Sequence, residues 1–495
     1  MTGKSKSPSF IIALLPIIVL ILLLVLNVSI YGDNATSGAN QIALLLSAAV
    51  AAVVGINLGF TWSSLQDGMV KSIKSALPAL MILLLIGALA GTWMASGVVP
   101  TMIYYGLKVL NPTFFLVAAC VVSAVVSVAT GSSWTTVATV GVALLGIGTA
   151  LGIQQGMIAG AIISGAYFGD KMSPLSDTTN LAPAMAGTDL FTHIRYMALT
   201  TVPSICIALI IFFVLGFTFD ATDNSAGVDS LLNAIDSKYY ISPVLFVVPV
   251  AVIVLIIKKV KAIPALFMGT ILGAIAAIIF QPDVIKEISG ISEDYVKASY
   301  AATMTSLSTS TAVMTENPMV NDLVQTKGML GMLNTIWLII CAMSFGGVME
   351  ACGLLTKITN SIVVFARSTG SLIATTASTC VFFNATTSDQ YLAIVVPGRM
   401  FANTYRERGL KPQNLSRALE DSGTVTSVLF PWNTCGAYQS GVLGVATGEY
   451  WLYCFFNLIS PVMTIIYGYF NIKIARFDAP QPDKVLDEDL DNLMD

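Results

Sequence analysis

The chain has 495 residues, of which 55% are hydrophobic and only 11% are charged, and its net charge at pH 7 is −4. A soluble globular protein carries roughly 25% charged residues, so this composition excludes an ordinary water-soluble fold. The small net charge gives no indication of a nucleic-acid-binding surface. The seven cysteines lie in apolar runs without a C-x-x-C pair, so we expect core-filling residues and no cofactor.

Long apolar segments recur along the chain, and each can cover most of a hydrocarbon core of about 30 Å as a helix. They lie near residues 9–30, 41–60, 76–98, 112–130, 153–168, 194–218, 241–257, 262–280, 329–351, 370–386, 414–430 and 450–472. The first is too long for the apolar part of a signal peptide, so we interpret it as an uncleaved span. Shorter apolar pieces lie near residues 135–150, 391–398 and 434–447. They are typical of half-helices, re-entrant hairpins or short spans. We therefore predict an all-α polytopic membrane protein with about 11–14 membrane segments.

Lysine and arginine orient the predicted spans, because basic residues collect on the cytoplasmic side. Basic residues, among them Lys4 and Lys6, precede the first span, and a dense basic stretch covers 399–417. The segment 219–240 is acidic instead, so we place it outside the cytoplasm. The predicted organisation is a first repeat at 1–218, an extracytoplasmic acidic linker at 219–240, a second repeat at 241–472 and an acidic cytoplasmic tail at 473–495.

One polar motif occurs twice in the chain. Residues 129–134 read ATGSSW and residues 385–390 read ATTSDQ, an offset of 256, while Pro174 and Pro431 lie 257 residues apart. An offset close to half of the chain length indicates two related halves. The predicted orientation of the second half is opposite to that of the first. Two inverted-topology repeats, each with a broken or re-entrant helix, are typical of secondary transporters whose site lies between the halves.

Four polar segments interrupt the apolar sequence, at residues 130–136, 170–180, 386–390 and 431–434. Each combines helix breakers with hydroxyl, amide or carboxylate groups. An unwound helix exposes backbone carbonyls and a partially charged helix end, which together can replace the hydration shell of a small cation. The candidate residues for ion binding or proton coupling are Thr130, Ser132, Ser133, Asp170, Ser176, Asp177, Thr178, Glu350, Thr387, Ser388, Asp389 and Asn433.

Two of these acids are the strongest candidates, because a carboxylate inside a membrane is functional by default. At the offsets above, Asp389 aligns with Ser133 and Asp177 aligns with Thr434. Each half therefore contributes one carboxylate from a non-equivalent element. We predict that Asp177 and Asp389 hold Na⁺, and that burial and mutual repulsion favour protonation of at least one of them near neutral pH. Glu350 is compatible with either a proton carrier or a residue at the end of a span.

Other charged residues have interpretations that involve no site. Asp170 is next to Lys171, so a local ion pair at a span end is an alternative to a role in ion binding. We expect Glu420 and Asp421 to be charges at the cytoplasmic rim. The single histidine, His193, is expected to lie at the membrane interface.

The polar motifs resemble those of the NhaC-type sodium/proton antiporter family. The resemblance is carried by GSSWTT at 131–136, GDKMSPLSDTT at 169–179 and FPWN at 430–433, and it covers roughly residues 10–475. It implies a multi-pass protein of the bacterial inner membrane that exchanges Na⁺ for H⁺, with Li⁺ as a second candidate cation. It also implies two inverted repeats with re-entrant hairpins. The expected partners are Na⁺, H⁺ and the lipid bilayer, with no nucleic acid, and a homodimer is left open.

The family resemblance leaves the substrate open, because some members resemble exchangers of malate and lactate. Such an exchanger requires a cationic side chain in its cavity, and the candidates, Lys171 and Arg399, are expected at the periphery. An intramembrane aspartyl protease using Asp170 and Asp389 is disfavoured, because Lys171 would keep Asp170 ionised whereas a catalytic dyad shares a proton. A channel is disfavoured because broken helices in both halves suit alternating access. We therefore expect a transporter and not an enzyme.

Overall fold

The structure, a computed structural model, describes residues 8–31, 35, 37–109, 111–218, 225–258, 260–315, 317, 320–321, 324–363 and 368–477. Lys4, Lys6, the first part of the predicted acidic linker and most of the predicted acidic tail lie outside the described residues. The proposed limits of the two repeats therefore stay predictions.

Helices dominate the fold, and the described ranges form no β-strand. This is expected inside lipid, where a helix satisfies all of its backbone polar groups internally. The helices of the N-terminal part are α1 (Phe10–Tyr31), α2 (Ala39–Asn57), α3 (Trp62–Ala95), α4 (Val98–Val109), α5 (Pro112–Thr130), α6 (Ser133–Thr136), α7 (Val142–Ala150), α8 (Gln155–Met172), α9 (Asp177–Ala186) and α10 (Leu190–Gly216). A π-helical turn, η2 (Val137–Gly141), joins α6 to α7.

The C-terminal part continues with helices that are more often interrupted. They are α11 (Ser225–Lys238), α12 (Val247–Ile257), α13 (Ala262–Phe280), α14 (Pro282–Ser289), α15 (Tyr295–Ser308), α17 (Leu333–Ala351), α18 (Leu354–Val363), α19 (Thr369–Thr386), α20 (Leu392–Glu407), α21 (Pro412–Leu419), α22 (Thr434–Leu443), α23 (Thr447–Tyr450) and α24 (Phe455–Tyr469). A second π-helical turn, η5 (Glu420–Thr424), extends α21, and the 3₁₀ turn η6 (Ser427–Leu429) follows it.

The long apolar helices show a multi-pass membrane protein. Eight helices of the described residues are long and apolar enough to cross a membrane, or up to ten if each of two bent pairs is one span. The 11–14 segments predicted from the sequence include half-helices, so their number is larger than that of the full-length spans. The short piece predicted at 434–447 contains α22, which has 10 residues, and α9, which was not among the predicted segments, also has 10. Such a helix is about 15 Å long and covers half of the hydrocarbon core.

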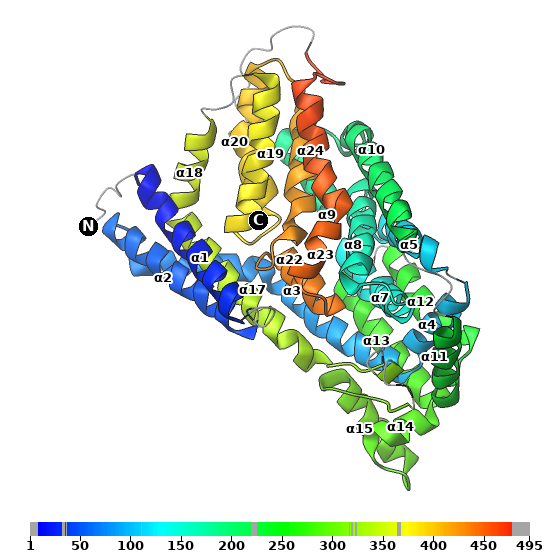
Figure 1. The fold of residues 1–495 in the computed structure, drawn as a ribbon. Helices are drawn as coiled ribbons and strands as arrows, with labels where there is room; N and C mark the ends of the chain where they lie inside the picture. Colours follow the sequence, from blue (N-terminus) through cyan, green and yellow to red (C-terminus); the bar gives the residue numbers. More distant parts are fainter. Residues whose placement is uncertain are drawn as a thin grey trace.

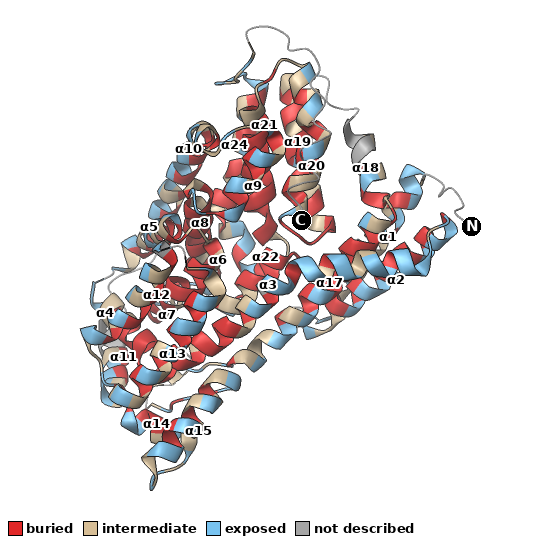
Figure 2. Ribbon diagram, turned by 180° about the vertical axis from the view of Figure 1, so that it is seen from behind, coloured by how far each residue is buried: buried red, intermediate tan, exposed pale blue. Residues whose placement is uncertain are grey.

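The helices form two groups in space (Figure 1). A slanted group contains α1, α2, α3, α13, α15 and α17, with α3 packed against α13 and α17. An upright group contains α5, α8, α9, α10, α19, α20, α22 and α24, with α5 packed against α8 and α19 against α24. Figure 2 shows that buried residues are concentrated inside the groups, whereas much of α1 and α2 is exposed. Each group contains helices from both halves of the chain.

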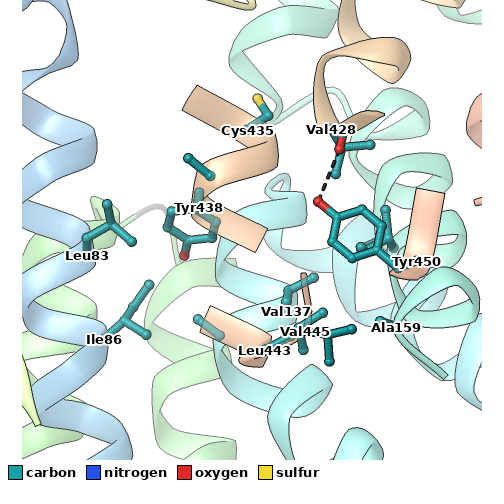
Figure 3. Close-up of a cluster of buried hydrophobic side chains, with 14 of the residues drawn as sticks. Leu83, Ile86, Val137, Ala159, Val428, Cys435, Tyr438, Leu443, Val445 and Tyr450 are labelled. Carbon is teal, nitrogen blue, oxygen red and sulfur yellow. Dashed lines mark hydrogen bonds between the residues drawn. The ribbon is translucent and has the colours of Figure 1, made fainter. Parts of the chain in front are cut away.

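An apolar cluster joins the two groups (Figure 3). Leu83 and Ile86 of α3, in the slanted group, lie next to Tyr438 of α22, in the upright group. On the far side of the cluster, the Tyr450 hydroxyl donates a hydrogen bond of 3.1 Å to the Val428 carbonyl. The contact between the groups is therefore largely apolar and carries few directional bonds.

The boundaries of the upright helices recur at a constant offset. The first residues of α5 and α19, Pro112 and Thr369, are 257 residues apart, and so are those of α9 and α22, Asp177 and Thr434. Helix α8 spans 155–172, and the broken helix of α21, η5 and η6 spans 412–429, again at 257. Corresponding elements of the two halves thus have equal or nearly equal lengths but different internal geometry.

Small residues let α5 and α8 approach closely. A Cβ on Gly165 would lie 2.0 Å from the Cys120 carbonyl oxygen, and one on Gly169 would lie 2.3 Å from the Ala124 carbonyl oxygen. The Ser127 hydroxyl also donates a 2.6 Å hydrogen bond to the Ala166 carbonyl. Lipid tails are as apolar as the side chains of the helices, so the hydrophobic effect does not drive helices together in a membrane. Close backbone approach and hydrogen bonds from hydroxyl groups join them instead.

This packing predicts that Gly165→Ala destabilises the protein. The added methyl group meets backbone of α5 that cannot move aside, and overpacking of this kind costs about 1–3 kcal/mol. The measurement is the apparent melting temperature in detergent, followed by size-exclusion chromatography. Gly448→Ala is the control, because a Cβ at Gly448 meets no heavy atom within 4 Å. Equal melting temperatures for the two variants would contradict the packing argument.

Candidate ion-binding site

The first helix break lies between α5 and α6. Gly131 ends α5 in the left-handed region, at φ 69°, where a side chain is disfavoured. Ser132 then caps α6, and its Oγ accepts a 3.2 Å hydrogen bond from the Thr135 amide. Thr130 and Thr136 place their hydroxyl oxygens 3.3 Å apart beside the break. The break therefore gathers hydroxyl groups between the carbonyl end of one helix and the amide end of the next.

Asp170 of α8 binds to the start of the helix after this break. Its Oδ2 accepts hydrogen bonds from the Ser133 amide at 3.0 Å and from the Ser133 Oγ at 2.6 Å. The side chain is buried, and these two donors offset part of the cost of removing a carboxylate from water. Lys171 does not pair with Asp170 but with Asp421. The alternative of a local ion pair at a span end is therefore wrong.

The predicted residues 176–178 lie at the start of α9. Ser176 caps this helix, accepting a 3.4 Å hydrogen bond from the Thr179 amide, and its Oγ lies 3.1 Å from the Thr178 Oγ1. Asp177 is the first residue of α9 and is exposed, whereas Ser176 and Thr178 are buried. Its carboxylate lies at the end of the helix where the dipole favours an anion.

The second break lies between α19 and α20. Thr387 ends α19, and Ser388 follows in the left-handed region at φ 61°, a strained conformation for a residue with a side chain. Asp389 is buried and its Oδ1 accepts a 2.9 Å hydrogen bond from the Leu392 amide. The Ser388 carbonyl is held by the Thr434 amide at 2.9 Å. Such strain is typical of functional sites.

Backbone geometry shifts the alignment of the two motifs by one residue. Gly131 and Ser388 share the left-handed conformation. Ser132 and Asp389 each accept a hydrogen bond from the amide three residues further on. The predicted pairing of Asp389 with Ser133 is therefore wrong by one, and Asp389 is the counterpart of the capping residue Ser132. The Ala-Thr pairs of the two motifs match at an offset of 256 residues. The left-handed residues and the helix-capping residues match at 257, which is also the offset of the other corresponding elements.

Helix α22 contacts both breaks. Near its start, the Cys435 Sγ lies 2.8 Å from the Gln390 Oε1 of the second motif. One turn later, the Tyr438 hydroxyl donates a 3.0 Å hydrogen bond to the Trp134 carbonyl of the first motif, and the two rings stack with centroids 3.9 Å apart. The short helix therefore brings the two polar motifs, far apart in sequence, into one site.

Asn433 fixes the start of α22. Its Oδ1 accepts a 3.0 Å hydrogen bond from the Cys435 amide, and its Nδ2 donates to the Asn384 carbonyl at 2.9 Å. Asn384 in turn donates a 2.7 Å hydrogen bond to the Gly423 carbonyl within η5. Asn433 thus has a clear role in holding three elements together.

Three of the candidate acids lie near one aromatic side chain. Tyr391 follows the second break, and its phenol lies within electrostatic range of Asp170, Asp177 and Asp389. Glu350, at the end of α17, is exposed and lies within electrostatic range of Asp389. The described residues contain no group of three His, Cys, Asp or Glu side chains that could hold a metal. The breaks instead present hydroxyls, carbonyls and single carboxylates, which suit a hard, weakly held cation such as Na⁺.

Sequence reasoning missed a buried charge network beside these breaks. Lys171 forms an ion pair with Asp421, and both side chains are fully buried. Lys171 also donates a 3.0 Å hydrogen bond to the Ser460 Oγ, and the Asp421 Oδ2 accepts one of 2.8 Å from the Thr200 Oγ1. Lys171 is therefore not peripheral and Asp421 is not a rim charge, because each compensates the other inside the protein.

Glu420 and His193 are also fully buried, so their predicted positions at the rim and interface are wrong. The His193 Nδ1 lies 2.8 Å from the Ser416 Oγ. Arg417 is buried too, with its guanidinium 4.5 Å from the Tyr196 ring centroid. One signal could have revealed this cluster: positions 417, 420 and 421 share one face of a helix inside an apolar segment.

Comparison with known proteins gives a consistent result. Residues 165–472 match the model of the Na⁺/H⁺ antiporter family. The Na⁺/H⁺ antiporter NhaC of Alkalihalophilus pseudofirmus is 38% identical over 88% of this chain and 91% of its own. The NhaC protein of Bacillus subtilis is 36% identical over 87% of this chain and 92% of its own. A malate-2H⁺/Na⁺-lactate antiporter of Bacillus subtilis is 35% identical over 87% of this chain and 89% of its own. The chain belongs to the Na⁺/H⁺ antiporter family, and within it to the NhaC type.

Proposed function

We propose that this protein is a secondary transporter that exchanges Na⁺ for H⁺ across the cell inner membrane by alternating access. The observation that carries the proposal is Asp389, a buried carboxylate at a strained helix break, held by an amide of the following helix. The relatives named as Na⁺/H⁺ antiporters support this choice of ions.

Asp389 lies at the break where helix α19 ends and helix α20 begins. The carbonyl end of α19 carries a partial negative charge that attracts a cation, and the amide end of α20 stabilises the Asp389 carboxylate. A dehydrated Na⁺ in a low dielectric needs one formal negative partner, and neutral oxygens complete its shell. The Ser388 hydroxyl, buried and without a hydrogen-bond partner among the described groups, is our candidate for one of these oxygens.

The proposed movement is a rigid displacement of the upright group against the slanted group. Their contact at Leu83, Ile86 and Tyr438 is apolar, so sliding there breaks few directional bonds. Substrate sites of such transporters lie near the bilayer midplane at broken helices. The two breaks meet around α22 in the upright group, so the bound ion would move with that group.

The first prediction of this proposal is that Asp389→Asn abolishes Na⁺-driven H⁺ movement while the protein still folds. An amide supplies only a dipole where Na⁺ requires a charge. The measurement uses purified protein in liposomes with a lumenal pH dye and a Na⁺ gradient. Asp283→Asn, which removes an exposed carboxylate of α14, is the matched control. Wild-type rates in Asp389→Asn would refute the assignment.

Ser388→Ala should raise the KM for Na⁺ more than it lowers the maximal rate, because it removes a neutral ligand.

The second prediction is that H⁺ competes with Na⁺ for this site. Na⁺ can bind only to the deprotonated carboxylate, so its apparent affinity must fall as the pH falls. In the acidic range, each pH unit should weaken Na⁺ binding by up to about tenfold per displaced proton, and at alkaline pH the affinity should level off. Initial rates at varied Na⁺ and pH measure this. An affinity that stays constant between about pH 6 and pH 9 would mean that Na⁺ and H⁺ use separate sites.

Exchange of organic acids is the second candidate function, since one relative is named as a malate-2H⁺/Na⁺-lactate antiporter. A carboxylate substrate requires an available cationic group. Lys171 is already paired with Asp421, whereas the buried Arg417 guanidinium has no hydrogen-bond partner among the described residues and is the candidate for this role. We favour inorganic ions because two of the relatives are named as Na⁺/H⁺ antiporters. The same liposomes, challenged in turn with Na⁺, Li⁺, K⁺, malate and lactate, distinguish the two functions, because H⁺ movement that requires malate or lactate would select the second.

A further inference from the structure

We propose that Glu420 binds a second transported proton at a site separate from Asp389. The inference rests on the proposed Na⁺/H⁺ exchange and adds a carboxylate to it. Glu420 begins the π-helical turn η5, in the broken helix that corresponds to the regular helix α8. π-helical turns are rare and are frequent at functional sites.

The Glu420 carboxyl group forms no ion pair and no hydrogen bond of ordinary geometry within the described structure. The side chain is fully buried. Two hydroxyls on the same turn, those of Ser422 and Thr424, also lack partners. Burying an uncompensated carboxylate costs several kcal/mol, whereas a neutral carboxylic acid costs much less. A bound proton removes this penalty.

The charges around Glu420 balance when this proton is present. Lys171 and Asp170 of α8 lie within electrostatic range of the Glu420 carboxyl group. Arg417 and Asp421 lie on its own broken helix, and Asp421 pairs with Lys171. The Lys171–Asp421 pair is neutral, and an ionised Asp170 would balance the charge of Arg417. A protonated Glu420 keeps the cluster neutral, and release of its proton leaves one negative charge.

The remaining groups near Glu420 do not supply another charge. Cys380 of α19 and the Thr178 hydroxyl of α9 lie close to its carboxyl group. His193 of α10, near Lys171, bonds to Ser416 through one ring nitrogen. The nearby cation Lys171 repels a metal ion, so the ligand that fits Glu420 is a proton.

Glu420 and Asp389 are separate carboxyl groups with different charged neighbours. The charged neighbour of Asp389 is Glu350, whereas those of Glu420 are Lys171 and Asp170. Two separate carboxyl groups can each accept a proton from one aqueous phase and release it into the other, as Glu–COOH becomes Glu–COO⁻ and H⁺. Cycling of both groups moves two protons for each Na⁺ and makes the exchange electrogenic.

The decisive measurement is the number of protons exchanged for each Na⁺. It is obtained at a set pH gradient and a clamped membrane potential, by finding the Na⁺ gradient at which net H⁺ movement stops. We expect two protons per Na⁺ for the wild type and one for Glu420→Gln, whose amide imitates the protonated acid and cannot titrate. Glu420→Asp retains a titratable carboxyl group and should keep the wild-type ratio. Glu407→Gln, which alters an exposed carboxylate at the end of α20, is the control.

Other outcomes overturn the proposal. A wild-type ratio of one proton per Na⁺ excludes a second carrier, and this holds even if Glu420→Gln fails to fold. An unchanged ratio in Glu420→Gln makes the residue structural. Loss of ²²Na⁺/Na⁺ exchange in folded Glu420→Gln places Glu420 in the sodium site instead. Absence of any Na⁺-dependent H⁺ movement by the wild type would reject the proposed function itself, and with it this inference.

Discussion

The cost of burying charge in a low dielectric governs the centre of this protein. Lys171 and Asp421 are fully buried, and each is acceptable only because the other is present, with Ser460 and Thr200 completing their hydrogen bonds. The pair joins α8 of the N-terminal half to the broken helix of the C-terminal half. Removing one partner would leave an isolated ion, a penalty of about 3–5 kcal/mol in comparable pairs. The pair therefore links the two halves of the chain beside the candidate site.

The same electrostatic constraint explains why the helices are broken. A continuous helix uses its carbonyls and amides internally, so it has nothing to offer an ion. The breaks at Gly131 and Ser388 free helix ends, and each amide end carries a carboxylate, Asp170 at Ser133 and Asp389 at Leu392. The two carboxylates come from non-equivalent positions of the repeat. The duplicated architecture therefore supplies similar scaffolds with unequal chemistry.

Much of the architecture could be predicted from the sequence, because lipid imposes a strong pattern. The predicted spans at 112–130 and 262–280 coincide with α5 and α13, and the polar motifs locate both breaks. The burial of Glu420 and Asp421 could not be predicted in this way, because it depends on a lysine that lies 250 residues from Asp421 in the sequence. Nearby basic residues suggested a cytoplasmic rim. The positive-inside rule describes loops, and it fails for charges that find partners within the helices.

Because Lys171 meets its partner only across this sequence distance, the order of synthesis has a consequence for membrane insertion. A ribosome adding about 5–20 residues per second needs about 12–50 s to make the intervening 250 residues. During that time the lysine of α8 is in the translocon or the bilayer without its carboxylate. The nascent N-terminal half must keep this charge hydrated or held near the interface until the C-terminal helices arrive. Assembly of the upright group is therefore a late event in biogenesis, completed after both halves have entered the membrane.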